Sequence, residues 1–482
     1  MTEIELKFQV PPARRAAVAQ AVATATASKV SLRARYFDSA DRRLGRAGLA
    51  LRVRKEGRLW VQTLKGAGDG IWQRLEHEMP LRVPAGVMPR ADPALHDGTP
   101  AGLALRQALG DAELQPLYGT EVMRTKRLLR APGCVVELAF DQGALVAGDR
   151  RWPLCELEIE LKSGEPAALV ALASRWVTRF GLTLDVRTKA ERGERLTRGV
   201  RLGAPVKARP LNLPDAVDSH TALRAVLGNC LAQVLANASD ITHEADTQPE
   251  QLHQLRVGLR RLRTALRELG PLSAELQPEW DEALRQLFGR LGAARDRDAL
   301  AQTLLPALRQ AGATGLELPR IEAEPVAQAA LRETTTTQLW LQLLAFAAGS
   351  GTSTEAFAPA LRQRLARLFK QVRRDAAVFA TLDDTARHRL RKRVKRLRYL
   401  SEFAASAFHG KPLQAFLKRL APVQEALGNF NDVCVARALF EHAAADDPMA
   451  MFALGWLAHE RDDAIKRCRR ALAPLRKARP YW

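Results

Sequence analysis

The chain has few aromatic residues and few cysteines, and it lacks a long apolar run. Only 6% of its 482 residues are aromatic, so surfaces on which nucleic-acid bases could stack are scarce. The five cysteines show no CxxC spacing, which argues against zinc sites and disulfides and indicates buried thiols in a reducing compartment. No apolar run approaches the ~20 residues that span a bilayer, and a strand-like segment at the start leaves no room for a signal peptide. We therefore expect a soluble, cytoplasmic protein without a membrane partner.

Motifs for nucleophilic and nucleotide-binding chemistry are also missing. The sequence contains no Ser-His-Asp arrangement and no GxSxG, P-loop or HExxH pattern, so a covalent mechanism has no candidate residues. What the chain has in excess is positive charge, with a formal net charge of +21 and a pI near 10.4. Such a charge predicts a polyanionic partner, namely nucleic acid, an anionic membrane or polyphosphate. It does not distinguish DNA from polyphosphate, because both bind in a salt-dependent way.

Two parts of the chain differ in their hydrophobic pattern. Residues 1–202 alternate strand-like and helical segments, whereas residues 217–482 carry Leu, Ala and Arg at helical spacing. The Gly- and Pro-containing residues 203–216 are typical of a linker. A chain of this length exceeds one ordinary core. We therefore expect two domains, the first α+β and the second all-α.

Strand-like segments of the first domain carry their charges on one face. Because successive side chains of a strand alternate between its faces, Glu3, Glu5 and Lys7 share one face, opposite Ile4 and Leu6. The predicted strands are 2–9, 31–38, 49–56, 58–65, 71–82, 121–130, 134–142, 154–162 and 183–189, with helices near 12–26, 101–109 and 166–180. The same parity groups Arg33 with Arg35, Arg52 with Arg54, Thr63 with Lys65, Arg74 with Glu76 and Glu78, Arg124 with Lys126, Glu137 with Asp141, Glu156 with Glu158, Glu160 and Lys162, and Asp185 with Arg187 and Lys189.

A sheet with one face in water would explain the charges of any single strand. Their repetition in register favours a closed antiparallel barrel of eight strands, with the charges in its lumen and helices covering its exterior. A barrel of about eight strands has room for one small ligand. Carboxylate oxygens bind hard cations, and Arg and Lys bind phosphoryl oxygens. Such a lumen suits a magnesium triphosphate.

The first domain resembles the CYTH superfamily, the triphosphate tunnel metalloenzymes. The segment Glu3-Ile4-Glu5-Leu6-Lys7 matches the ExExK signature of that superfamily. The resemblance continues through Tyr36-Phe37-Asp38, Leu51-Arg52-Val53-Arg54, Thr63-Leu64-Lys65-Gly66, Gln73-Arg74-Leu75-Glu76, Cys155-Glu156-Leu157-Glu158-Ile159-Glu160 and Lys189-Ala190-Glu191-Arg192-Gly193. It covers essentially residues 1–200 and implies metal-dependent hydrolysis of a triphosphate in the tunnel.

This resemblance also implies a role for each charged residue. The implied ligands of Mg²⁺ or Mn²⁺ are Glu3, Glu5, Glu158 and Glu160, with Glu156, Glu76, Glu78, Glu137 and Asp141 as second-rank candidates. The implied phosphate-binding cations are Lys7, Lys65, Arg52 and Arg54, which we expect to act in catalysis, and Arg74, Arg124, Lys126 and Lys189, which we expect to bind substrate. Phosphoryl transfer depends mainly on such positioning and charge stabilisation.

An internal repeat organises the second domain. Residues three and four apart share a helix face, and two such cationic rows are His253, Arg256, Arg260 and Arg263, and His388, Arg391, Lys395 and Arg398. A solvated helix would explain one row but not its duplication. The rows resemble the CHAD domain, over roughly residues 217–482, which implies two repeated four-helix bundles (about 217–350 and 355–482) that bind polyphosphate. Lys395 stands where the first row has Arg260, which keeps the charge but loses the bidentate fork.

The leading interpretation is hydrolysis of inorganic tripolyphosphate to pyrophosphate and phosphate in the tunnel, with polyphosphate bound by the helical domain and no specific nucleic acid. One alternative keeps the tunnel but changes the substrate to nucleoside or thiamine triphosphate, or to ATP for cyclisation. These need a pocket for a ring, and Trp60 and Trp72 fall on the parity opposite the charges. The other alternative is a non-enzymatic polyanion-binding protein, against which the intact set of acids and bases argues.

Overall fold

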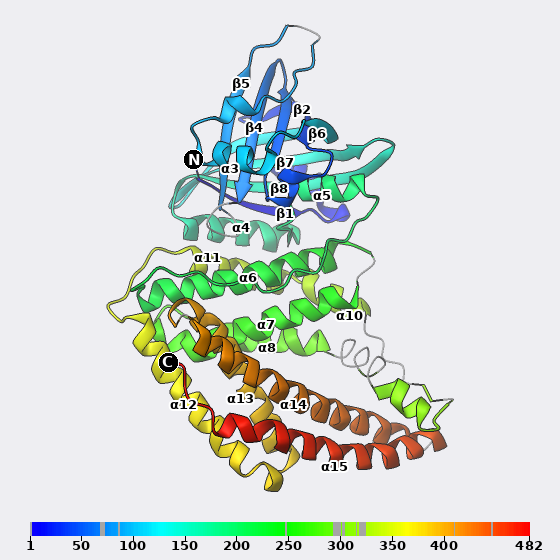
Figure 1. The fold of residues 1–482 in the computed structure, drawn as a ribbon. Helices are drawn as coiled ribbons and strands as arrows, with labels where there is room; N and C mark the ends of the chain where they lie inside the picture. Colours follow the sequence, from blue (N-terminus) through cyan, green and yellow to red (C-terminus); the bar gives the residue numbers. More distant parts are fainter. Residues whose placement is uncertain are drawn as a thin grey trace. The chain divides into compact units, whose positions relative to one another are not determined.

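The computed structural model describes residues 2–67, 73–84, 87–245, 248–292, 300, 304–314, 316–317, 324–408, 410–444 and 447–482 (Figure 1). The chain divides into two compact units. The first comprises Met1–Val206, Leu235–Thr247 and Leu331–Gly349, and the second comprises Lys207–Val234, Gln248–Ala330 and Ser350–Trp482. The first unit thus includes two helical segments from the later part of the chain.

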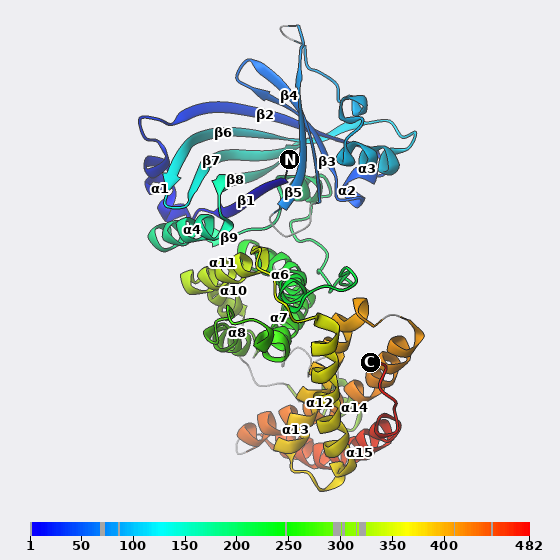
Figure 2. The ribbon, with the colours of Figure 1, turned by 90° about the vertical axis from the view of Figure 1, so that its left-hand side faces the viewer.

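An antiparallel sheet of nine strands forms the centre of the first unit. Its strands are β1 (Thr2–Gln9), β2 (Ser28–Asp38), β3 (Ala50–Glu56), β4 (Leu59–Ala67), β5 (Gln73–Leu81), β6 (Gln115–Ala131), β7 (Cys134–Ala147), β8 (Arg150–Gly164) and β9 (Thr183–Leu184). They follow the order β5-β4-β3-β2-β6-β7-β8-β1-β9. The first strand in this order, β5, also pairs with β1 (Figure 2). In this pairing Glu3 lies opposite Arg74.

The register places the predicted charged residues of seven strands, β1 and β3 to β8, on one side of the sheet, which we call the charged face. Cross-strand neighbours on this face are Glu5 and Glu160, Lys7 and Glu158, Gln9 and Glu156, Asp141 and Glu156, Arg124 and Asp141, Arg52 and Thr63, and Lys65 and Glu76. On the opposite face, Leu51, Val53 and Leu64 are buried beneath α3. The predicted alternation of charged and apolar faces therefore holds through most of the sheet.

Short helices cover the strands. They are η1 (Pro12–Arg14), α1 (Arg15–Val22), α2 (Arg43–Arg46), η2 (Pro93–His96), α3 (Pro100–Leu109), α4 (Pro166–Phe180) and α5 (Lys189–Thr197). Helix α3 begins where the Thr99 hydroxyl accepts a hydrogen bond from Gly102 N, with Pro100 in the first turn. Helix α4 contacts β7 and β8. Helix α5 instead contributes Leu196 to a cluster with Leu32 and Val122, on the apolar end of the charged face.

Two predictions about this sheet are wrong. The strand predicted over 183–189 ends at Leu184, and Lys189 opens α5. The cause is a capping box, in which Thr188 and Glu191 each satisfy the other's backbone N–H. Arg33 and Arg35 are exposed and lie opposite Lys55 and Val53, on the face away from the other charges.

The charged face also carries two aromatic side chains. Tyr36 and Tyr118 lie on it and stack on each other, with ring centroids 4.8 Å apart. As predicted, Trp60 lies on the outer face, whereas Trp72 is outside the described residues.

The later part of the chain is helical, as predicted. Its helices are α6 (Ser219–His243), α7 (Pro249–Leu269), η3 (Gly270–Leu272), α8 (Glu279–Arg290), α10 (Glu324–Arg332), α11 (Thr334–Ala348), α12 (Phe357–Ala377), η4 (Phe379–Thr381), α13 (Asp384–Phe403), η5 (Ala404–Ser406), α14 (Lys411–Ala443) and α15 (Pro448–Arg476). Leu255, Leu259 and Leu262 form the buried stripe of α7. Among the described helices, none is long and apolar enough to cross a membrane.

Candidate active site

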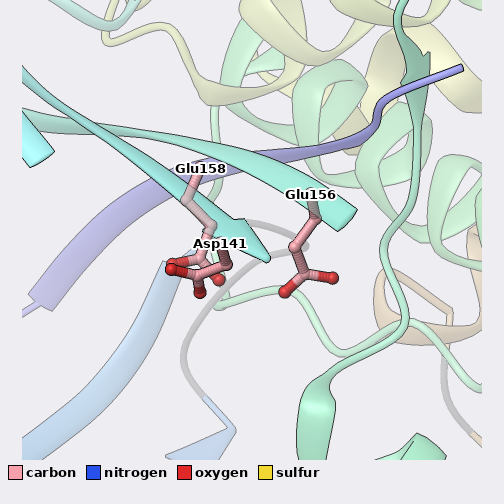
Figure 3. A group of neighbouring side chains, drawn as sticks. All are labelled: Asp141, Glu156 and Glu158. Carbon is pink, nitrogen blue, oxygen red and sulfur yellow. The ribbon is translucent and has the colours of Figure 1, made fainter. Parts of the chain in front are cut away.

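Three carboxylates meet on the charged face. Asp141 extends from β7, and Glu156 and Glu158 extend from β8 to the same side (Figure 3). One oxygen of each lies within 4.8 Å of the others. The strand register brings them together, because Asp141 lies directly opposite Glu156. Asp141 and Glu156 are fully buried, so their charges need partners.

Lys189, the first residue of α5, lies among the three carboxylates. Its Nζ atom is 2.8 Å from Asp141 Oδ2 and 2.5 Å from both Glu156 Oε1 and Glu158 Oε1. The capping box fixes where α5 begins and therefore fixes the position of this ammonium group.

Two arginines complete the set of contacts. Arg124 on β6 donates to Asp141 Oδ1 at 2.7 Å and to Glu158 Oε2 at 2.5 Å, and Arg192 on α5 donates to Glu156 Oε2 at 2.5 Å. Three cations thus face three anions in a buried cluster, which we call the carboxylate cluster.

These contacts decide the charge state of the carboxylate cluster. Burial alone would raise the pKa of Glu156, but Arg192, Lys189 and Lys7 lower it to about 2. Burial opposes ionisation of Glu158 in the same way, and Lys189 and Arg124 hold its pKa well below its ordinary range. Burial alone would lower the pKa of Lys189, but the three carboxylates raise it well above its ordinary value. At neutral pH Glu156, Glu158 and Lys189 are therefore charged.

The carboxylate cluster fits a hard divalent cation. Mg²⁺ and Mn²⁺ prefer carboxylate oxygens, and three are available here within a small radius. In addition, Glu156 Oε1 is buried and makes no hydrogen bond within the described part of the chain, although Lys189 lies beside it. A bound cation would compete with the Lys189 ammonium group for this buried carboxylate oxygen.

A second group of charges lies on the same face, on β3, β4 and β5. Lys65 Nζ is 3.0 Å from Glu76 Oε2, and Arg52 Nη2 is 3.9 Å from Glu76 Oε1. Arg54 forms ion pairs with Glu56 and, at 3.6 Å, with Glu78. The Nε atoms of Arg52 and Arg54 are buried and make no hydrogen bond to any described residue. Buried guanidinium nitrogens without partners favour an anionic ligand.

The structure brings some predicted site residues together and separates others. Of the predicted metal ligands, Glu158 belongs to the carboxylate cluster, whereas Glu5 and Glu160 lie opposite each other further along β1 and β8, outside it. The side chains of Glu3 and Arg74 lie outside the described part. Lys126 Nζ is 3.8 Å from Glu137 Oε2, also on the charged face.

Two contacts of the site, made by Arg192 and by Lys7, were not predicted from the sequence. Arg192 received no role, although its spacing of three from Lys189 on a helix would have placed both on one face. The Lys7 ammonium group donates a hydrogen bond to the backbone carbonyl of Arg187, and no sequence pattern reports such a contact.

Comparison with known families identifies both parts of the chain. Residues 1–193 match the CYTH domain and residues 225–441 match the CHAD domain. The chain carries a CYTH domain followed by a CHAD domain. The resemblances drawn from the ExExK segment and from the two cationic rows are confirmed.

Relatives of this CYTH–CHAD chain cover it to different extents. An inorganic triphosphatase of Haemophilus influenzae is 29% identical over 204 residues, which are 40% of this chain and only 54% of that protein. An uncharacterised protein of Mycobacterium tuberculosis is 26% identical over 538 residues, covering 98% of this chain and 96% of that protein. The crystal structure of the CHAD domain from the plant Ricinus communis is 32% identical with a TM-score of 0.47, and covers 56% of this chain and 97% of that one.

In the CHAD domain, the two cationic rows lie on α7 and α13, which contact each other. Arg256 and Arg260 on α7 are close enough to Lys395 on α13 to lower its pKa, and Arg263 does the same to Lys392. We call this meeting of like charges the basic seam; its members are Arg256, Arg260, Arg263, Arg391, Lys392 and Lys395.

The members of the predicted rows differ in how far the protein neutralises them. Arg263 pairs with Asp281 at 3.0 Å, and Arg398 with Glu402 at 2.8 Å. Lys395, in contrast, is surrounded mainly by like charges. Burial, Arg391 and Arg260 lower its pKa to about 6, and the attraction of Asp432 does not compensate. Self-repulsion of this kind is relieved when an anion binds.

Proposed function

We propose that the chain is a metal-dependent triphosphatase that cleaves inorganic tripolyphosphate to pyrophosphate and phosphate on the charged face of the CYTH domain. The observation that carries the proposal is the carboxylate cluster with Lys189 and Arg124, on the same face as the buried Nε atoms of Arg52 and Arg54, which have no hydrogen-bond partner among the described residues. The name of the Haemophilus influenzae relative supports it. We further propose that the pairing of β1 with β5 makes β1–β8 an eight-stranded tunnel.

The chemistry follows from where the charges lie. A divalent cation bound by the carboxylate cluster would neutralise phosphoryl oxygens and orient a water molecule. Arg52, Arg54 and Lys65 would bind phosphoryl oxygens on β3 and β4, and Arg124 and Lys189 would do so beside the carboxylates. Lys7, Arg74 and Lys126 keep their predicted roles as phosphate-binding residues. All these residues act by binding and orienting, so no covalent intermediate on the protein is needed.

The packing of the aromatic residues on the charged face favours an inorganic substrate over a nucleotide. Tyr36 and Tyr118 stack on each other, and a Cβ atom at Gly193 would lie 2.2 Å from the Tyr118 ring, so α5 packs closely against it. Trp152, also on the charged face, is buried in an apolar cluster. These three rings pack against other parts of the protein, which disfavours their use as a stacking surface for a nucleobase.

The test is phosphate release by the full chain with Mg²⁺ or Mn²⁺ from tripolyphosphate, ATP, thiamine triphosphate and pyrophosphate. We expect tripolyphosphate to be cleaved fastest and the activity to be lost with EDTA. Equal or faster cleavage of ATP would contradict the inorganic substrate. No release from any compound would contradict the enzymatic proposal and would favour a polyanion-binding protein.

For the CHAD domain we propose polyphosphate binding along the basic seam, flanked by His253, His388 and Arg398. The seam supports this because its cations repel one another and several of them are partly buried. We expect Arg256→Ala combined with Arg391→Ala to weaken polyphosphate binding at least about 100-fold, as two charge-assisted contacts of about 1.5–3 kcal/mol each imply. Tripolyphosphate turnover should stay within about twofold. Unchanged polyphosphate affinity, measured by calorimetry at fixed salt, would contradict the proposal.

The lowered pKa of Lys395 predicts that the protein takes up a proton when it binds polyphosphate. With a pKa of about 6 this amine is mostly neutral at pH 7.5, and a bound polyanion would favour its charged form. We expect uptake of about one proton and an affinity that falls as the pH rises from 6 to 8. Calorimetry in buffers of different ionisation enthalpy measures the uptake.

The matched control for this proton uptake is Lys395→Arg, because a guanidinium group stays charged throughout this pH range. The difference between the two proteins removes any contribution from His388, whose pKa is also lowered by burial and by Lys392 and Arg391. Equal proton uptake by the native protein and by Lys395→Arg would contradict the prediction.

A further inference from the structure

The end of helix α6 and the residue after it bind the segment that connects β9 to α5. Ser239 Oγ accepts a hydrogen bond from Val186 N at 3.1 Å. Arg187 donates to Asp240 Oδ1 at 3.3 Å and to Glu244 Oε1 at 2.6 Å. All of these residues belong to the first compact unit, although residues 239–244 lie within the CHAD match.

The same segment also contacts the charged face. Lys7 Nζ donates to the carbonyl oxygen of Arg187, and the backbone N–H of Asp185 donates to the carbonyl oxygen of Lys7 at 2.9 Å. Gln9, next to Lys7 on this face, donates to Asp185 Oδ2 at 2.9 Å. Lys189, which lies in the carboxylate cluster, follows Arg187 by two residues. One short stretch of backbone thus connects α6 to two cations of the site.

Burial makes this connection rigid. Arg187, Asp240 and Glu244 each expose 4% of their side chains, and Asp185 exposes none. Three carboxylates, of Asp185, Asp240 and Glu244, surround the single guanidinium group of Arg187. Arg195 pairs with Asp240 at 2.6 Å and Arg201 pairs with Glu244 at 3.7 Å, so that three cations balance the three carboxylates. Removing one partner from such a buried ion network leaves another charge uncompensated, so the backbone must shift to relieve it.

We infer that Asp240 and Glu244 are positioning residues for Lys7: by binding the Arg187 side chain they fix the Arg187 carbonyl that orients the Lys7 ammonium group on the charged face. They do not touch substrate themselves. The consequence is that a CHAD segment sets the geometry of the CYTH site. That Lys7 serves hydrolysis rests on the proposed function, whereas its orientation by α6 does not.

The experiment uses the full chain with Glu244→Ala, Glu244→Gln and Asn237→Ala. Glutamine keeps an oxygen that can accept from Arg187. Asn237 is the matched control, because it is also buried on α6 but bonds to the N–H and carbonyl of Val206 in the linker. Two readouts are measured: the acetylation rate of Lys7 relative to the exposed Lys29, by mass spectrometry, and kcat and KM for tripolyphosphate. Thermal melts identify any variant that does not fold.

We expect Glu244→Ala to raise the relative acetylation rate of Lys7 about tenfold, because its 7% exposure depends on the fixed carbonyl. We expect kcat to fall about 10- to 100-fold with little change in KM, the size of effect that a displaced site residue produces. Glu244→Gln should restore most of the native protection of Lys7 and most of the native kcat. Asn237→Ala should resemble the native protein in both measurements.

Two outcomes would overturn the inference: a Glu244→Ala protein with native labelling of Lys7, or an Asn237→Ala protein that changes Lys7 labelling as much as Glu244→Ala does. If the native protein releases no phosphate from tripolyphosphate, the proposed function fails. The labelling data still decide the inference in that case, because they do not depend on turnover.

Discussion

Replacing Glu158 by glutamine is expected to lower tripolyphosphate turnover by about a thousandfold, comparable to the loss of one essential electrostatic group in an active site. Glu158 is a first-rank predicted metal ligand that lies in the carboxylate cluster, beside the second-rank candidates Asp141 and Glu156, and it also contacts Lys189 and Arg124. A neutral amide would weaken the cation site and release both basic side chains from their positions. Phosphate release at saturating Mg²⁺ measures the effect.

The matched control is Glu121→Gln. Glu121 lies on β6 but faces away from the charged face, where it pairs with Arg151 at 3.2 Å and is half exposed. Its variant should keep native turnover. A Glu158→Gln protein with more than about a tenth of native activity would contradict the assignment of the cluster as the metal site. Glu5→Gln in the same assay distinguishes the two candidate sets of metal ligands. Loss of turnover would favour the set implied by ExExK, and native turnover would favour the carboxylate cluster alone.

The alternation of charged and apolar residues was sufficient to predict most of the sheet. The predicted strand 2–9 coincides with β1, and the predicted helix 166–180 coincides with α4. Alternation is a local property, so it can be recognised one strand at a time. It also assigned Glu156 and Glu158 to one face together, because both lie on the same strand.

Register and strand order could not be predicted, because they depend on partners distant in sequence. Nothing local states that Asp141 lies opposite Glu156, and this pairing is what creates the carboxylate cluster. For the same reason Glu5 and Glu160, chosen by motif, turn out to lie beside the cluster. Lys189 was predicted on a strand because Asp185, Arg187 and Lys189 alternate. The Thr188–Glu191 capping box also lies in this segment and favours a helix, and the structure has helix α5 beginning at Lys189.

Replacing Lys189 by methionine is expected to destabilise the protein by about 3–5 kcal/mol at pH 7 without divalent cations. The ammonium group lies within 2.8 Å of three carboxylates and is itself only 13% exposed. Without it, three clustered negative charges keep only Arg124, Arg192 and the more distant Lys7 as neighbouring cations among the described residues. Urea unfolding of the native and variant proteins gives the difference in the free energy of unfolding. The exposed Lys29→Met provides the control, with a change below about 0.5 kcal/mol.

The pH dependence of this difference is itself a test of its cause. In the native protein the pKa of Glu156 is lowered from its ordinary 4.5 to about 2, so the stability it contributes is present above pH 4.5 and is lost as the pH falls through 2. In the variant, burial acts against weaker attraction and raises the carboxylate pKa values, so that protonation relieves the repulsion as the pH falls. The loss of stability should therefore be smaller at pH 4.5 than at pH 7. Mg²⁺ should stabilise the variant more than the native protein, because no ammonium group competes for the same oxygens. A loss that is independent of both pH and Mg²⁺ would indicate a packing defect and not the loss of a central charge.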